Sequence, residues 1–407
     1  MSVATLVRRP GYRLLLAGQG VSAIGDWMAT IAFMALVLEV TGSPAAVGGI
    51  LTLRLLPAAV GGPLAARAAQ RWDRRHTMLA MDATRAAMVA AVPLVHALWW
   101  IYIWAFAVEV ASLVFLPARD SSIPDLVDES ELPLANGLVL GSSYGSIPIG
   151  AGLFAAVAAL PFNDIAGRSL ALVFLLDALT FLVSFAFIAR IRMAATQPAV
   201  APEDRVGFRS AFSIPLVRAV MPAAAAVALG LGALFSLGIV FVREVLDASD
   251  IGFGLLIALF GIGAVAGVAV LQRQAAPDSL LTTRLGVAAI GIVVAVFSLA
   301  PELWLAFLGA VAFGATAAYT LAAAMSTVQA RLSGQDRLLA FAAFHVVIRI
   351  ALGLAAVGAG VAGDLLGAVR WPLVGTLEPA RVVLLCSGLL VFLSAGLVQE
   401  RRPAGAG

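Results

Sequence analysis

Residues 216–242 read LVRAVMPAAAAVALGLGALFSLGIVFV, a stretch in which Arg218 is the single charged residue. An α-helix rises 1.5 Å per residue, so about 20 apolar residues cross the hydrocarbon core of a bilayer. The stretch is long enough to do so, and we predict that it forms a transmembrane helix.

Similar apolar runs recur along the 407 residues, of which 62% are hydrophobic and 12% charged. Soluble domains carry about 25% charged residues, so a water-soluble fold is excluded. Backbone groups in lipid must pair internally, and continuous apolar runs favour helices over the alternating strands of a barrel. We predict an all-α integral membrane protein with twelve transmembrane helices, at 12–38, 45–68, 77–97, 99–118, 134–160, 169–189, 216–242, 251–271, 284–300, 303–328, 338–362 and 380–398.

The placement of the basic residues predicts the orientation of these helices. All 26 are arginines, and 19 of them fall in loops on the side of the N-terminus. The opposite loops hold four: Arg168, Arg243, Arg370 and Arg381. By the positive-inside rule, we expect a multi-pass protein of the cell (inner) membrane with both termini in the cytoplasm.

Several function classes lack support in the sequence. Cys386 is the single cysteine, and the histidines His76, His96 and His345 lack the spacing of metal ligands. A chain without lysine cannot carry a phosphate-binding Gly-x-x-x-x-Gly-Lys motif, and paired catalytic motifs are also missing. The arginines sit in short loops between apolar runs, a pattern typical of membrane topology and not of a nucleic-acid surface. We therefore expect no enzyme, no cofactor and no nucleic-acid partner.

The longest polar loop runs from about Arg190 to Ser213 and separates six predicted helices from six. Short matches between the two parts recur at a near-constant offset: Gly48 and Leu51 match Gly252 and Leu255, and residues 134–135 match 339–340. Repeated six-helix halves are a recurrent plan of secondary transporters. We predict an N-terminal six-helix bundle at 1–190, a cytoplasmic linker at 191–215 and a C-terminal six-helix bundle at 216–407.

Asp26 and Arg54 are charged residues inside predicted helices, where a charge is costly and usually has a partner. Each lies fifteen residues from the inner end of its helix, so both sit roughly 22 Å deep. We predict that they pair. The pair either fixes helix packing or holds an acid that titrates when a substrate or a proton disturbs it.

Several short motifs identify a family resemblance. Residues 66–75 read ARAAQRWDRR, and residues 18–26 read GQGVSAIGD. Further motifs are Thr41–Ser43, Pro117–Arg119, Ile123–Val127, Leu134–Asn136 and Asp177–Phe181. Together they resemble the major facilitator superfamily along nearly the whole chain, and in particular its bacterial drug, macrolide and siderophore exporter branch. The resemblance implies two pseudo-symmetric six-helix bundles that move substrate by alternating access.

The resemblance assigns an inner-gate motif to Gln70, Arg71, Asp73, Arg74 and Arg75. Gln70 stands where the family has an acid that helps latch the gate, and Asp73 is a candidate substitute. Residues 146–152 only echo the antiporter signature of the fifth helix, because its Gly-Pro pair is missing.

The resemblance also places Glu109 on a helix that lines the central cavity, where it could bind a cation or carry a proton. Its alternative is a neutral, hydrogen-bonded acid. His345 and Arg349 share one helix face at a spacing of four residues. They could attract an anion or respond to pH, or they could form an interhelical clasp. Three further charges inside the helices are predicted to be structural: Asp82, Arg85 and Asp177.

These features predict a secondary active transporter, expected to be monomeric, that exports a hydrophobic or amphipathic small molecule, such as a drug, natural product or siderophore. Protons are expected to drive it, with Asp26 and Glu109 as carriers influenced by Arg54 and Arg349. Two alternatives stay open. The chain could import a solute or conduct it without coupling, or it could be a non-transporting membrane sensor or accessory subunit on the same fold.

Overall fold

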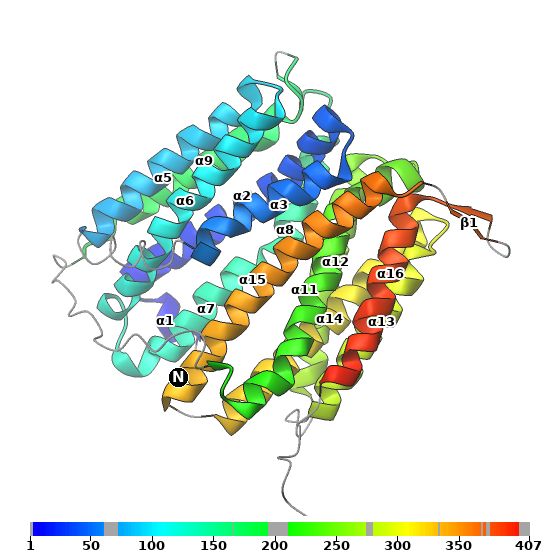
Figure 1. Ribbon diagram of the computed structural model, residues 1–407. Helices are drawn as coiled ribbons and strands as arrows, with labels where there is room; N and C mark the ends of the chain where they lie inside the picture. The colour runs from blue at the N-terminus through cyan, green and yellow to red at the C-terminus, as the bar shows by residue number, and fades with distance from the viewer. Residues whose placement is uncertain are drawn as a thin grey trace, which may run out of the picture. The chain divides into compact units, whose positions relative to one another are not determined.

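A computed structural model of the protein (Figure 1) describes residues 3–60, 72–165, 167–193, 211–273, 280–332, 334–367, 369–371 and 375–398. Each of the twelve predicted apolar runs contains a helix. Ten helical segments among the described residues are long and apolar enough to cross a membrane. The prediction of a helical transmembrane architecture is therefore confirmed.

Two predicted spans fall outside these ten segments for physical reasons. The helix α3 (Pro44–Val60) is apolar but short, and residues 61–71 after it lie outside the described part of the chain. The helix α5 (Arg74–Ala91) carries several charges, including the buried residues Asp82 and Arg85. Charged residues lower the hydropathy of α5 although its length is sufficient to span the membrane.

The described residues divide into two compact units. Unit 1 contains the described residues of Met1–Gly42 and Leu53–Ala201. Its helices besides part of α3 are α1 (Val3–Val7), α2 (Pro10–Thr41), α5 (Arg74–Ala91), α6 (Leu98–Ser122), α7 (Leu132–Gly145), α8 (Ile147–Ala158) and α9 (Ala171–Ala189), with 3-10 turns at Val92–Leu94, Ile123–Asp125 and Glu129–Glu131. The helix α2 packs along α9 and α8, while α5 packs against both α6 and α9.

The fifth predicted span is broken into α7 and α8 at Ser146. Pro148 lies in the first turn of α8, where its missing N–H leaves no hydrogen bond unmade. Gly150 packs against the α2 backbone beside Trp27, because a side chain at this position would overlap it.

Unit 2 contains the described residues of Ser43–Thr52 and Pro202–Gly407. Its elements besides part of α3 are α11 (Pro215–Val240) with a π-helical turn at Phe241–Val245, α12 (Asp250–Gln272), α13 (Leu280–Ser298), α14 (Leu303–Arg331), α15 (Gly334–Leu365), β1 (Val369–Trp371), β2 (Gly375–Leu377) and α16 (Pro379–Ser394) with a 3-10 turn at Ala395–Leu397. The main helix pairs are α12 with α14, α11 with α15 and α13 with α16. Gly263 and Gly267, four residues apart, lie against the backbone of α14, because small residues let two helices approach closely.

The first part of α3 packs within unit 2. Gly48 lies directly against the α15 backbone at Ala356. Thr52 Oγ1 donates to the Gly353 carbonyl at 2.8 Å. At the start of α3, the Ser43 hydroxyl donates to Asp364 at 2.6 Å. The predicted N-terminal bundle, 1–190, contains the whole of α3, whereas the structure groups Ser43–Thr52 with unit 2.

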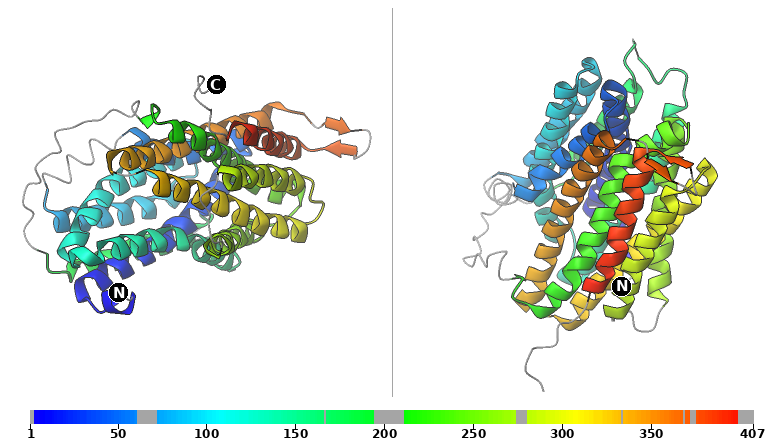
Figure 2. Two further views of the ribbon diagram at one scale, coloured as in Figure 1. Left: turned by 90° about the horizontal axis from the view of Figure 1, so that it is seen from below. Right: turned by 45° about the vertical axis from the view of Figure 1, so that its right-hand side comes forward.

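The strands β1 and β2 form a short antiparallel hairpin, with Val369 paired to Leu377. The hairpin extends beyond the ends of α15 and α16 (Figure 2). It was not predicted, and it adds a small departure from an entirely helical chain. Most of the predicted linker, at 194–210, lies outside the described residues.

Candidate functional site

Arg54 lies at the centre of a polar cluster in unit 1. Its Nε and Nη2 atoms donate to Glu109 Oε1 on α6 at 2.8 and 2.7 Å. Its Nη1 atom donates to Thr30 Oγ1 on α2 at 2.7 Å, and its guanidinium lies 5.2 Å from the Phe33 ring centroid. The side chains of Arg54 and Glu109 keep 11% and 25% of their surface exposed, so the pair is not completely buried.

The prediction that Arg54 pairs with Asp26 is wrong. Among the described residues, no hydrogen bond or ion pair joins these two side chains, and Arg54 binds Glu109 instead. Thr30 connects them indirectly, since its hydroxyl donates to the Asp26 backbone carbonyl at 2.6 Å. Equal depth in two helices does not fix the direction in which each side chain points, and the long arginine reaches α6.

Asp26 nevertheless belongs to the same cluster. Its carboxyl group interacts electrostatically with Arg85 and Glu109, and with Arg54. Asp26 and Thr30 are four residues apart, so they share one face of α2. Asp26 therefore interacts both with the partly exposed Arg54–Glu109 pair and with a second, buried group of charges.

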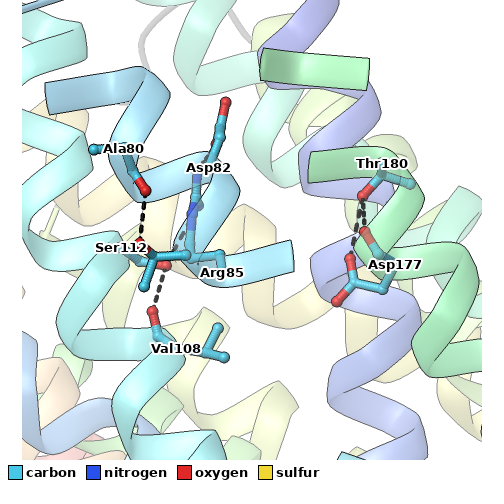
Figure 3. A network of polar contacts seen from close by, with 8 residues as sticks. Ala80, Asp82, Arg85, Val108, Ser112, Asp177 and Thr180 are labelled. Carbon is cyan, nitrogen blue, oxygen red and sulfur yellow. Dashed lines mark hydrogen bonds and ion pairs between the residues drawn. The ribbon is translucent and has the colours of Figure 1, made fainter. Parts of the chain in front are cut away.

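That second group is the ion pair of Arg85 with Asp82 on α5 (Figure 3). Arg85 is 3% exposed and Asp82 is fully buried. The guanidinium lies 4.3 Å from the ring centroids of both Phe115 and Phe181. It also contacts Ser112 Oγ at 3.4 Å. Two aromatic faces and a carboxylate hold Arg85 in place.

Asp177 on α9 is buried at 1% exposure and accepts a hydrogen bond from Thr180 Oγ1 at 3.2 Å (Figure 3). Gly25 brings α2 against this acid, because a Cβ atom at that position would overlap Asp177 Oδ1 and Thr180 Oγ1. Asp177 also interacts electrostatically with Asp26. The sequence predicts a structural role for Asp82, Arg85 and Asp177, and that role stays a prediction; all three are buried in unit 1.

Two other predicted site residues lie on α15 in unit 2. Arg349 is half-buried there. The side chain of His345 lies outside the described part of the structure. Their shared helix face stays a prediction.

The described part of the inner-gate motif stabilises helix ends in unit 1. Gln70 and Arg71 lie outside the described residues. Asp73 caps α5 by accepting the His76 N–H at 2.8 Å, and this backbone hydrogen bond lowers the pKa of Asp73. Arg74 forms an ion pair with Asp125, in the turn after α6, at 2.7 Å. Arg75 donates to the carbonyl of Ala189, the last residue of α9.

Sequence reasoning missed the neutral members of the cluster. Thr30, Phe33, Phe115 and Phe181 hold the two arginines, and Ser184 lies beside Asp82. The helical spacing of Thr30 from Asp26 was an available signal. The phenylalanines could not be distinguished from ordinary core residues. In the described residues, no group of three or more His, Cys, Asp and Glu side chains could hold a metal ion.

Comparison with known proteins places these features in context. The family model described as "Major Facilitator Superfamily" matches residues 15–280. The "Uncharacterized MFS-type transporter YfiS" of Bacillus subtilis (strain 168) is 29% identical over 126 residues, which cover 31% of this chain and 30% of that protein. The chain therefore matches less than a third of the relative's length.

Solved structures of low sequence identity share the fold. A bacterial homologue of the human lysosomal transporter Spinster has a TM-score of 0.74 at 17% identity, covering 97% of this chain and 98% of the other. The nucleoside transporter NupG has a TM-score of 0.74 at 10% identity, with coverages of 95% and 98%. A D-xylose–proton symporter has a TM-score of 0.72 at 13% identity, with coverages of 96% and 98%.

Proposed function

This chain belongs to the Major Facilitator Superfamily, and from that premise we propose that it is a secondary active transporter that exports a hydrophobic or amphipathic small molecule in exchange for protons. Drugs, natural products and siderophores are the substrate classes suggested by its sequence motifs. The observation that carries the proposal is the Arg54–Glu109 pair, with Asp26 in the same cluster. Ionisable groups inside a membrane bundle commonly mark substrate or proton pathways.

Each charged group has a role in this proposal. Glu109 binds the positive charge of a substrate or receives a proton, and Arg54 pairs with its carboxyl group when no substrate is bound. A substrate cation that displaces Arg54 from Glu109 changes the charge balance around Asp26. Competition between substrate and proton for the same acids couples the two fluxes.

Unit 2 contains a small apolar pocket. It is lined by side chains that include Leu234, Phe235, Phe260, Phe297 and Phe313. Aromatic and aliphatic walls favour an apolar group because its transfer from water is favourable.

Proton release on substrate addition tests this proposal. Purified protein in weakly buffered detergent solution is mixed with cationic, neutral and anionic candidates. We expect a cationic amphipathic compound to release protons from the wild type but not from Glu109→Gln or Asp26→Asn. The control Asp120→Asn changes an acid on the same helix whose side chain is 57% exposed, and it should keep the release. A compound that binds the wild type without proton release would refute antiport.

Direction and orientation need separate measurements. We propose that the protein is a monomer of the inner membrane with both termini in the cytoplasm. Cells that express it should accumulate less of the released compound than cells with Glu109→Gln. Greater accumulation would indicate import. A reporter that is active only in the cytoplasm should be active when fused to either terminus, and a reporter that is active only outside the cytoplasm should be inactive at both.

A further inference from the structure

Arg349 is a charged residue without a partner in the part of α15 that is apolar enough to cross a membrane. Its side chain is half-buried. Among the residues that the structure describes, none forms an ion pair, a hydrogen bond or a ring contact with this side chain. An arginine has five N–H donors and cannot lose its charge, so these donors and this charge need a partner from elsewhere.

The neighbouring helix α11 shows how deep Arg349 lies. Gly232 on α11 packs against the α15 backbone at Leu352, three residues from Arg349. Gly232 lies inside the apolar stretch between Arg218 and Arg243, fourteen residues from the first and eleven from the second. These separations correspond to roughly 21 and 16 Å along the helix. Arg349 therefore lies well inside the apolar layer of unit 2, away from the charged helix ends.

The guanidinium belongs to the packed side of α15. Helical spacing puts Arg349 on the same face as Gly353, four residues later. Gly353 lies at the contact with α3, where its carbonyl accepts the Thr52 hydroxyl at 2.8 Å. Ile350 and Leu354, which are 47% and 69% exposed, mark a different face of the helix.

The acidic residues of unit 2 do not balance this charge. Its described carboxyl groups all lie at helix ends or in the turns between helices: Glu244, Asp247, Asp250, Glu302, Asp336, Asp364 and Glu378. A charge inside a membrane bundle is costly, and it usually faces a partner or a substrate pathway. An anion that enters the site from outside the chain would supply the missing charge.

We propose that Arg349 binds the carboxylate of an amphipathic substrate. The planar guanidinium can donate two parallel hydrogen bonds to the two oxygens of a carboxylate. One arginine balances the single charge of a carboxylate, whereas a phosphate monoester carries nearly two negative charges at neutral pH and would leave an excess. The inference deepens the proposed function and rests on it only for the transport of the bound compound. It narrows the substrates to compounds that carry a carboxylate, alone or beside a cationic group.

Thermal unfolding of the purified protein in detergent tests this site. The probes are 1-naphthoate and cyclohexanecarboxylate, each compared with its neutral amide. A compound that binds the folded protein raises the melting temperature as its concentration increases. We expect both carboxylates to do so in the wild type, and the amides to have a much smaller effect.

Two variants show whether Arg349 is responsible. Arg349→Gln should weaken carboxylate binding about tenfold to hundredfold, the change that the loss of a charge-assisted hydrogen bond corresponds to. Arg284→Gln removes an exposed arginine near the start of α13 in the same unit and should keep the wild-type affinity. Unchanged carboxylate affinity in Arg349→Gln, or no gain from either carboxylate in the wild type, would overturn the proposal.

The unliganded proteins distinguish binding from a structural role. Without a carboxylate, Arg349→Gln should melt at or above the wild-type temperature, because it removes a charge that has no partner in the described part of the chain. A clearly lower melting temperature would show that the protein itself holds Arg349, and would overturn the proposal.

Other ligands provide the remaining outcomes. An equal gain from the amides would show that charge is not recognised, an equal gain from chloride would show a small-anion site, and an equal gain from phosphatidylglycerol would show a lipid site. Each of these results would overturn the proposal. Because binding is measured without a proton gradient, a protein that binds carboxylates at Arg349 but exports nothing would refute the proposed function alone. A protein that exports without this preference would refute this inference alone.

Discussion

Removal of Arg54 alone should destabilise the protein more than removal of the whole Arg54–Glu109 pair. In Arg54→Met the Glu109 carboxylate loses both of its donors, at 2.7 and 2.8 Å, and stays largely buried without a counter-charge. A lone charge at such a site costs several kcal/mol, whereas an uncharged pair of similar size is often tolerated. The double variant Arg54→Met/Glu109→Gln has no lone charge.

The contact geometry sets the size of this effect. Two unit charges about 4 Å apart attract by about 4 kcal/mol at the effective dielectric constant of a protein near its surface. Water screens part of this, because 11% of the Arg54 side chain and 25% of the Glu109 side chain are exposed. We expect losses of about 3 kcal/mol for Arg54→Met, about 1 for Glu109→Gln and about 2 for the double variant. The coupling between the two positions is then about 2 kcal/mol.

Reversible unfolding in mixed detergent, repeated for the four proteins of the cycle, measures this coupling. A second cycle on Arg74 and Asp125 is the control, since that pair has the same 2.7 Å separation but exposes 21% and 35% of its side chains. Its coupling should stay below about 1 kcal/mol, as for other exposed pairs. Additive losses at Arg54 and Glu109 would refute the view that this pair is the central electrostatic contact of unit 1.

Three further predictions concern helix packing and helix ends. Gly25→Val should lower stability by about 1–3 kcal/mol in thermal unfolding, because its Cβ would overlap polar side chains of α9, whereas Gly20→Val on the same helix meets open space and should change little. Asp73→Ala should cost about 1 kcal/mol at neutral pH. The His76 N–H lowers the pKa of Asp73, so its stabilising effect is fully present above the ordinary pKa and is lost as pH falls through the lowered one. The difference from wild type in chemical unfolding should begin to shrink below about pH 4 and disappear once the pH lies below the lowered pKa. Asp364→Ala should lower the melting temperature, because this carboxylate accepts hydrogen bonds at the start of α3.

The positions of the helices could be predicted from the sequence because long apolar runs have one solution in lipid. The pairing inside unit 1 could not. Helical rise gave Asp26 and Arg54 the same depth, but rotation about each helix axis decides the partner, and rotation depends on packing. Gly25 illustrates this dependence, since the close approach of α2 to α9 that it permits brings Asp177 to the cluster. A single sequence shows the glycine but not the helix that it faces.

The charged residues of the cluster differ in exposure, and this difference suggests separate roles for them. A substrate can act only on groups that it can touch, and the Arg54–Glu109 pair keeps part of its surface open. Asp82, Arg85 and Asp177 are almost completely buried, so a substrate does not touch them. If Glu109 recognises the substrate while the closed acids store the proton, then Asp26, which interacts with both groups, is the residue through which substrate binding changes proton affinity. Neutralising Asp26 should therefore remove coupling while leaving both the substrate contact and the buried ion pair in place.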